Sequence, residues 1–296
     1  MNQSRKIALS TPSDREIAWT REFDAPSRLV FDAYTKPELI RRWLLGPPGW
    51  EMTECRVDLR VGGEYRWAWK HPEQGSMGMG GVYREIIRPR KIVSTEKYDQ
   101  SWYAGEGIGT VLLVEVGDKT TVTTTMLYET MGGRNMALQS AMETGLNTGY
   151  DLMDNILADS KKRGRRILQS VLALVGGFAV VAGLSMATDL ILESAGLLPP
   201  LDKPQDYTEG MLVVALGYRI LYSVIGFFLA ALWAPLNPMR HALVLGFIGT
   251  LFAVLGAIAN WGFGHHWYAI LLAAVTLPCA WIGVKILSLA KKTKEN

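Results

Sequence analysis

Lys161-Lys162-Arg163-Gly164-Arg165-Arg166 separates two halves of this 296-residue chain that differ sharply in composition. Short polar and apolar segments alternate before it. Four long apolar stretches follow it, at 167–190, 211–233, 242–261 and 267–289. Each has roughly the 20 residues that a helix needs to cross about 30 Å of hydrocarbon. The sequence therefore predicts a water-soluble α+β domain followed by an all-α bundle of four transmembrane helices.

The net charge of +3 is unevenly distributed along the chain. Residues 1–160 carry 19 Lys/Arg and 22 Asp/Glu, whereas residues 161–296 carry 12 and 6. The basic excess thus lies beside the apolar stretches, where the positive-inside rule places it, and does not indicate a nucleic-acid partner. Basic and non-basic connections alternate along the second half. We therefore expect a multi-pass protein of the bacterial cytoplasmic (inner) membrane with both termini in the cytoplasm.

The expected domain organisation follows from these boundaries. The first 20 residues are polar and contain no apolar segment typical of a secretory signal, so we expect the soluble domain to stay in the cytosol. Cys55 and Cys279 lie in different halves and do not suggest a disulfide. We expect a polar tail at 1–14, the soluble domain at 15–160, a basic linker at 161–166, the four spans within 167–290 and a basic tail at 291–296.

The soluble half has the pattern of one strand, two short helices, about six strands and one long helix. Residues 16–23 alternate as a strand, and Pro26 suits the first turn of a helix. Gly46-Pro47-Pro48-Gly49 forms a turn before the six alternating segments, which are 50–59, 63–70, 77–87, 91–99, 109–116 and 120–128. Apolar residues at helical spacing from Leu138 to Leu157 predict a closing helix at about 134–159.

Several short motifs follow one another along this half of the chain. They are Arg21–Pro26, Val30–Ala33, Arg42-Trp43 with Gly46-Pro47, Asp58–Gly63, Gly81–Ile86, Thr95-Glu96 and Gly149-Tyr150. With these motifs, residues 15–160 resemble the SRPBCC (START-like, helix-grip) superfamily, and within it the bacterial homologues of the Hsp90 ATPase activator. The resemblance implies an antiparallel sheet wrapped around a long C-terminal helix, with a ligand cavity between them. It carries no shared catalytic set. The apolar half resembles small four-span bacterial membrane proteins.

Aromatic and methionine side chains mark the expected inner face of the sheet and helix. They alternate on the expected strands or lie on the helical stripe, and the candidates for ligand binding are Tyr65, Trp67, Trp69, Met79, Tyr83, Met126 and Met142. Tyr128 shares the strand face of Met126, and Tyr150 shares the helical face of Met142. Such side chains suit an adaptable apolar pocket, but they equally suit a filled hydrophobic core. Trp102 and Tyr103 lie in a Gly-containing stretch that forms either a loop over the cavity mouth or a simple hairpin connection.

Glu96 alternates with Ser94 and Tyr98 on an expected strand. If Tyr98 points inward as a ligand-binding residue, Glu96 does too, and burial would raise the pKa of its carboxyl and let it orient or protonate a ligand. In the alternative, Val93, Thr95 and Lys97 face inward, or Glu96 pairs with an arginine. Glu96 is the one catalytic candidate, because Ser-His-Asp, phosphate-loop and dinucleotide patterns do not occur. The sequence predicts no cofactor and no metal site.

Arg219 lies about 12 Å into the second apolar stretch at the helical rise per residue. An arginine at such a depth usually faces a partner or a water-filled cavity, and Asp189, near the end of the first stretch, is the candidate partner. Such a pair fixes the register of two helices, or serves substrate or ion handling; an arginine that snorkels to the interface is the other possibility.

These patterns favour a membrane-anchored protein that binds a small hydrophobic ligand or lipid in a cytoplasmic helix-grip cavity. Three alternatives remain open. The soluble domain could be a protein-interaction or co-chaperone-like module, it could be a cyclase- or hydrolase-type enzyme that uses Glu96, or the spans could form a small transporter that the soluble domain regulates.

Overall fold

The structure is a computed structural model that describes residues 6–100, 103, 105–140, 142–200, 203–259, 261–263 and 265–295. The chain divides into two compact units, Met1–Lys162 and Arg163–Asn296. The first is called the sheet unit and the second the helical unit below. The division falls inside the basic run Lys161–Arg166.

Within the described residues, the sheet unit contains one antiparallel sheet of eight strands in the order β1-β2-β8-β7-β6-β5-β4-β3. The strands are β1 Ala8–Ser10, β2 Glu16–Phe23, β3 Glu51–Val57, β4 Glu64–His71, β5 Gly75–Ile87, β6 Lys91–Tyr98, β7 Gly107–Val116 and β8 Lys119–Leu127. Gly117 adopts a φ of +60° between β7 and β8, which is why a Gly-Asp pair can close this hairpin. Neighbouring strands of this sheet are consecutive in the chain, except for β2 and β8, which pair although all the other strands from β3 to β7 lie between them in the sequence.

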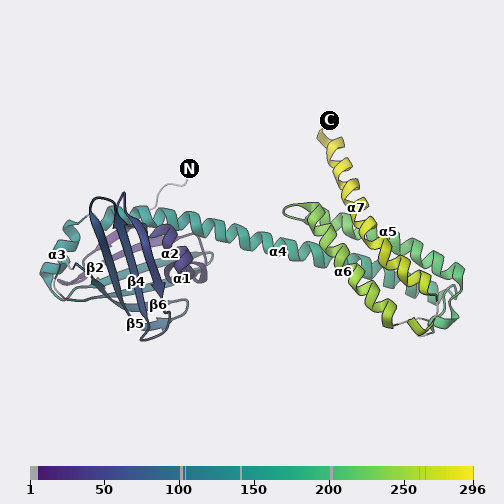
Figure 1. Cartoon of the computed structure of the whole chain (residues 1–296), viewed down its shortest axis with the longest axis horizontal. Helices are drawn as coiled ribbons and strands as arrows, with labels where there is room; N and C mark the ends of the chain where they lie inside the picture. The colour runs from purple at the N-terminus through teal and green to yellow at the C-terminus, as the bar shows by residue number, and fades with distance from the viewer. Residues whose placement is uncertain are drawn as a thin grey trace. The chain divides into compact units, whose positions relative to one another are not determined.

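Two short helices connect β2 to β3, and two further helices follow the sheet. The first pair is α1 Ser27–Thr35 and α2 Pro37–Trp43, and the second pair is α3 Met131–Gln139 and α4 Met142–Ser194. Pro37 occupies the first turn of α2, where its missing N–H leaves no hydrogen bond unmade. Figure 1 shows the strands of the sheet running beside the first part of α4. This is the helix-grip arrangement.

Tyr150 of α4 lies at the centre of the core between helix and sheet. Its hydroxyl accepts a hydrogen bond from Trp19 Nε1 at 2.9 Å and one from the Tyr34 hydroxyl at 2.7 Å. Its ring meets Phe23 edge-on, with the centroids 5.4 Å apart. Met153, Ile156 and Leu157 continue this buried face along α4. Burial of each such side chain contributes about 1.5–3 kcal/mol, so this face holds the helix in the concave sheet.

The expected strands, both short helices and the closing helix are present, but two helix boundaries differ from the expectation. Residues 134–159 are not one helix, because α3 ends at Gln139 and α4 begins at Met142. The expected linker 161–166 is helical, since α4 continues through it to Ser194. Lysine and arginine are good helix formers, and the single Gly164 costs only about 1 kcal/mol relative to alanine. The short strand β1 was not predicted.

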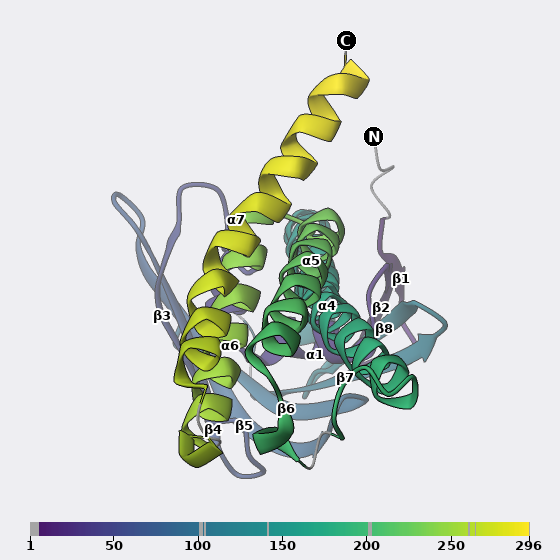
Figure 2. The same ribbon diagram turned by 90° about the vertical axis from the view of Figure 1, so that its right-hand side faces the viewer.

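The helical unit consists of the second part of α4 with α5 Glu209–Trp233, α6 Pro238–Ala259 and α7 His266–Glu295 (Figure 2). In the described part of the chain, these four helices are long and apolar enough to cross a membrane. Their outward side chains are also apolar, and Phe247 and Ile258 are 68% and 67% exposed. A water-soluble bundle buries one apolar stripe per helix and carries polar residues outside, so this surface fits a hydrocarbon solvent.

Candidate functional site

The inner face of β4, β5 and β6 carries a group of aromatic side chains in register. Trp67 of β4 pairs with Met79 of β5, and Met79 pairs with Tyr98 of β6. The ring of Tyr65 lies 4.6 Å from that of Trp67 and 5.4 Å from that of Tyr83, measured between centroids. The strand alternation predicted from the sequence therefore places these side chains on one face, as expected.

Glu96 of β6 lies among these aromatic side chains. Burial raises the pKa of its carboxyl to about 7. Burial, and next the charge of Glu96, also raise the pKa of the Tyr65, Tyr98, Tyr103 and Tyr128 phenols. The carboxyl therefore lies within electrostatic reach of four tyrosines, which is the inward orientation that one of the two sequence alternatives required.

No described residue forms a hydrogen bond or an ion pair with the Glu96 carboxyl. The residue opposite Glu96 on β7 is Gly107, which has no side chain that could contact the carboxyl. A Cβ at Gly107 would lie 3.0 Å from Met126 Cε and 3.3 Å from the Tyr103 hydroxyl, so a larger residue would crowd both side chains. Glu96 remains half-buried, so it keeps surface that another molecule could contact.

Trp67 supplies a second polar atom that has no partner in this interior. Its Nε1 is buried and forms no hydrogen bond with the described residues. A buried donor without an acceptor costs about 1–3 kcal/mol, which most folded proteins avoid. The interior thus holds one N–H donor and one titratable carboxyl that the described protein atoms leave unsatisfied.

The predicted ligand-binding residues separate into two groups by burial. Tyr65, Tyr83 and Met126 are buried members of the hydrophobic core, so these three fit the filled-core alternative. Trp69 and Met79 are buried as well, and Trp69 Nε1 donates to the Leu44 carbonyl at 3.1 Å, at the end of α2. The half-buried residues are Trp67, Glu96, Tyr98 and Met142. Trp102 lies outside the described residues.

Tyr103 and Tyr128 also lie beside Glu96. The sequence placed Tyr128 on the inner face with Met126, and it placed Tyr103 in the aromatic stretch after β6. Their rings meet edge-on with centroids 5.3 Å apart, and Tyr103 also meets Tyr98 at 6.3 Å. Tyr128 follows β8 and continues the alternation of Met126, which is a signal that the sequence contains. Tyr103 is placed by the β6–β7 connection, whose path no strand pattern predicts.

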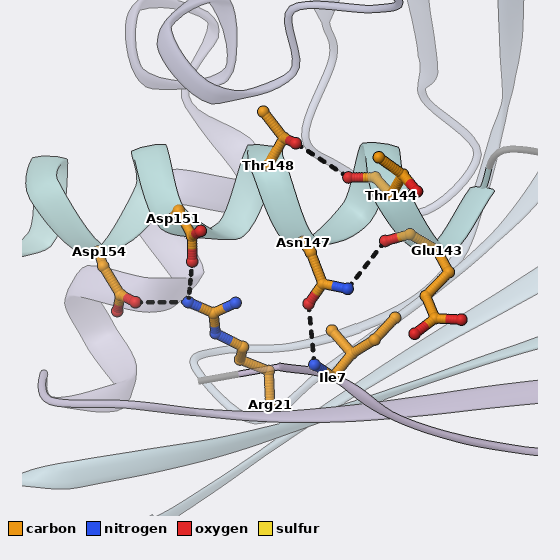
Figure 3. Close-up of polar contacts among 8 residues, drawn as sticks. All are labelled: Ile7, Arg21, Glu143, Thr144, Asn147, Thr148, Asp151 and Asp154. Atoms are coloured by element: carbon orange, nitrogen blue, oxygen red, sulfur yellow. Dashed lines mark hydrogen bonds and ion pairs between the residues drawn. The ribbon is translucent and has the colours of Figure 1, made fainter. Parts of the chain in front are cut away.

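Arg21 of β2 is a buried cation that the sequence patterns did not single out. Figure 3 shows its guanidinium pointing from the sheet toward α4, where Nη2 lies 2.7 Å from both Asp151 Oδ1 and Asp154 Oδ2. The side chain of Arg21 has no exposed surface. Its alternation with Trp19 and Phe23 could have predicted an inward position, and the i, i+3 spacing of the two aspartates could have predicted a shared partner. These contacts join the sheet to the helix on the side of Tyr150.

The helical unit contains a separate polar cluster, in which Asp189 and Arg219 come together. Arg219 Nη2 lies 2.8 Å from Asp189 Oδ2, and Tyr218 donates to Asp189 while Arg219 donates to Tyr268. Each polar group therefore has a partner from another side chain. These contacts link α4, α5 and α7. Within the described residues, no group of three or more His, Cys, Asp and Glu could hold a metal ion.

Comparisons with known proteins find one matching family model and several similar solved structures. The family model of the activator of Hsp90 ATPase homolog 1-like proteins matches residues 24–158. A crystal structure from Rhodobacter sphaeroides is 30% identical, covers 52% of this chain and 99% of its own, and has a TM-score of 0.49. A solution structure from Staphylococcus epidermidis is 28% identical over 52% and 94% of the two chains, with a TM-score of 0.45. An HSP90 activator from Plasmodium falciparum is 25% identical over 38% and 72%, with a TM-score of 0.31. The comparison with curated proteins finds no match.

Proposed function

The chain belongs to the activator of Hsp90 ATPase homolog 1-like family through residues 24–158, and we propose that it is a membrane-anchored helix-grip protein that binds a small hydrophobic ligand or lipid. The family fold supports a ligand-binding or co-chaperone-like domain. The choice of ligand binding rests on the interior of the sheet unit, and on one observation in particular.

That observation is the Glu96 carboxyl, which stands among four tyrosines without a partner from the described residues. A carboxyl in such a place costs free energy unless something hydrogen-bonds to it. A ligand hydroxyl or amine would supply that hydrogen bond, and a ligand oxygen would accept from Trp67 Nε1. The half-buried rings of Trp67 and Tyr98 would contact the apolar body of the same ligand.

The four apolar helices support anchoring of this domain to a membrane. The basic residues at 161–166 and 291–294 support an orientation in which both termini lie in the cytoplasm. Apolar ligands concentrate in the bilayer, so a binding domain attached to membrane helices would meet them there. We therefore propose that the ligand is mostly apolar with one small hydrogen-bonding group.

The proposal is tested on the full chain purified in detergent, with native mass spectrometry and organic extraction of the bound material. We expect a reproducible apolar molecule that the wild type retains and that Glu96→Gln and Trp67→Phe lose or retain less. Glu64→Gln is the matched control, because Glu64 is an exposed residue on β4. Retention equal in all four proteins would assign the molecule to the helical unit and refute ligand binding at Glu96.

The same experiment distinguishes the other hypotheses. A stable cytosolic protein that copurifies with a chain free of small molecules would favour a protein-interaction module. A chemically altered molecule in the wild type, with its precursor in Glu96→Gln, would favour an enzyme. Since Arg219 is already paired with Asp189, the structure offers less support for a transporter that uses Arg219 to bind its substrate.

A further inference from the structure

A cavity of about 320 Å³ lies in the helical unit at the end where α5 connects to α6. It is lined by Arg166 and Ser170 of α4, Pro235 and Asn237 of the α5–α6 connection, and Arg240 and His241 of α6. Two segments that are distant in the sequence, 166–174 and 235–244, thus meet around one space, and two of the nine lining residues carry guanidinium cations.

In the part of the chain that the structure describes, Arg166 and Arg240 form no side-chain hydrogen bond or ion pair. The sequence accounts for this, because no Asp or Glu occurs in residues 163–188 or 210–294. The acidic residues of the helical unit occur in the sequence between Asp189 and Glu209 and at Glu295. The cavity is therefore a cationic space in which the described residues place no carboxylate against either guanidinium group.

A second cavity of about 570 Å³ adjoins the first and is almost entirely apolar. Asn237, Arg240 and Val244 line both cavities, and the second continues along α6 past Leu243, Phe247 and Ile248. Phe247 is 68% exposed, so its ring is available to an apolar partner. The two cavities together offer cations at one end of α6 and hydrocarbon further along the same helix.

We propose that these adjoining cavities bind one anionic phospholipid, with its phosphate between Arg166 and Arg240 and an acyl chain along Leu243 and Phe247. Guanidinium groups bind phosphate oxygens through paired, charge-assisted hydrogen bonds. Basic pockets between membrane helices bind anionic head groups for the same reason. A free phosphate ion has the same head-group chemistry, but it would leave the apolar cavity unused. The site rests on the proposed membrane insertion and is independent of the ligand at Glu96.

The test is a titration of the full chain in detergent with phosphatidylglycerol or phosphatidylcholine of identical acyl chains, read by native mass spectrometry. We expect phosphatidylglycerol to bind about twenty-five-fold more tightly, since each of the two arginines near an anionic head group contributes about fivefold. Arg166→Gln with Arg240→Gln should abolish this preference. Arg163→Gln with Arg165→Gln is the matched control, because it also removes two positive charges, and it should preserve the preference.

Two further measurements distinguish a bound lipid from a bound ion. Phe247→Ala changes an exposed side chain, so the protein should fold normally while its affinity for phosphatidylglycerol falls several-fold. Displacement of the lipid by excess inorganic phosphate, or an unchanged affinity in Phe247→Ala, would show an ion site and overturn the proposal. Equal binding of both lipids, or an equal loss in the matched control, would also overturn it. Failure of the Glu96 experiment would leave these outcomes unaffected, because it changes only residues of the sheet unit.

Discussion

Arg219 of α5 and Asp189 of α4 form an ion pair in which Nη2 and Oδ2 are 2.8 Å apart. Their side chains are 25% and 10% exposed, so both charges are largely removed from solvent. Arg219 also donates to Tyr268 of α7, and this extends the contact to a third helix. A pair in this position is costly to break, because the remaining charge stays between packed helices.

Asp189→Asn should therefore destabilise the helical unit by about 3 kcal/mol, the lower end of the cost of leaving a buried charge unpaired. The melting temperature of the full chain in detergent measures this loss. The double variant Asp189→Asn with Arg219→Gln removes both charges and should recover part of it. If the double variant is as unstable as the sum of the two single variants, the pair contributes no coupling energy and the prediction is wrong.

Close packing of α4 on α5 depends on Gly226. A Cβ at this position would lie 2.3 Å from Val181 Cγ2 and 2.7 Å from the Gly177 carbonyl oxygen. Gly226→Ala should force the helices apart and cost about 1–3 kcal/mol. Gly217→Ala on the same helix is the matched control, because a Cβ there meets no atom within 4 Å. We expect the control to melt at or above the wild-type temperature, since alanine favours a helix over glycine. Equal melting temperatures for the two variants would contradict the close approach.

Periodicity predicted most of the fold because it reports which side chains are buried. The strand expected at 16–23 is β2 residue for residue, and the apolar stretch expected at 211–233 lies within α5 Glu209–Trp233. Periodicity does not report where a helix continues through polar residues, so the basic run 161–166 was interpreted as a linker although α4 passes through it. Short β1 has too few residues to show a pattern.

The site was less predictable, since a pattern assigns a face but no partner. The alternation of Glu96 with Tyr98 left two orientations open, and the sheet register together with the surrounding tyrosines favours the inward one. The contact between Arg21 and two aspartates 130 and 133 residues away depends on how the sheet curves around α4. The cavity at Arg166 and Arg240 likewise exists only after α4 and the start of α6 have come together.

Replacing Arg21 should destabilise the protein less than replacing its two aspartate partners. Its side chain is fully buried, whereas those of Asp151 and Asp154 are 45% and 32% exposed. Two of its nitrogens, Nε and Nη1, already lack hydrogen bonds to the described residues. Replacing both aspartates by asparagine leaves this buried cation without a carboxylate and should cost about 3–5 kcal/mol. Arg21→Met leaves two carboxylates that water can reach, so it should cost less.

The destabilisation by Arg21→Met and by the double aspartate variant is measured through hydrogen exchange of the β2 amides in the full chain. Asp159→Asn is the matched control, because Asp159 is an exposed aspartate on the same helix. We expect this control to leave the exchange rates of β2 unchanged. Faster exchange in Arg21→Met than in the double aspartate variant would show that packing of the arginine stem, and not its charge, dominates the contact.

The raised pKa of Glu96 predicts that the stability of the folded protein falls as the pH rises. Its pKa is about 7 in the folded protein against 4.5 for an ordinary glutamate, so between these values the folded state binds more protons than the unfolded one. The free energy of unfolding therefore falls as pH rises from about 4.5 to about 7, and the loss is complete above the folded pKa. A difference of this size corresponds to about 3 kcal/mol, which is an upper bound because the side chain is only half-buried.

Glu96→Gln removes this titration, so its stability advantage over the wild type should grow across that pH window and level off above it. Melting temperatures measured from pH 4.5 to pH 8 on the ligand-free full chain test this. Glu64→Gln, which changes an exposed glutamate, should follow the wild-type profile. Parallel profiles for the wild type and Glu96→Gln would mean that the Glu96 carboxyl is well hydrated in the folded protein. In that case the carboxyl would need no ligand to satisfy it, and the main support for ligand binding would be lost.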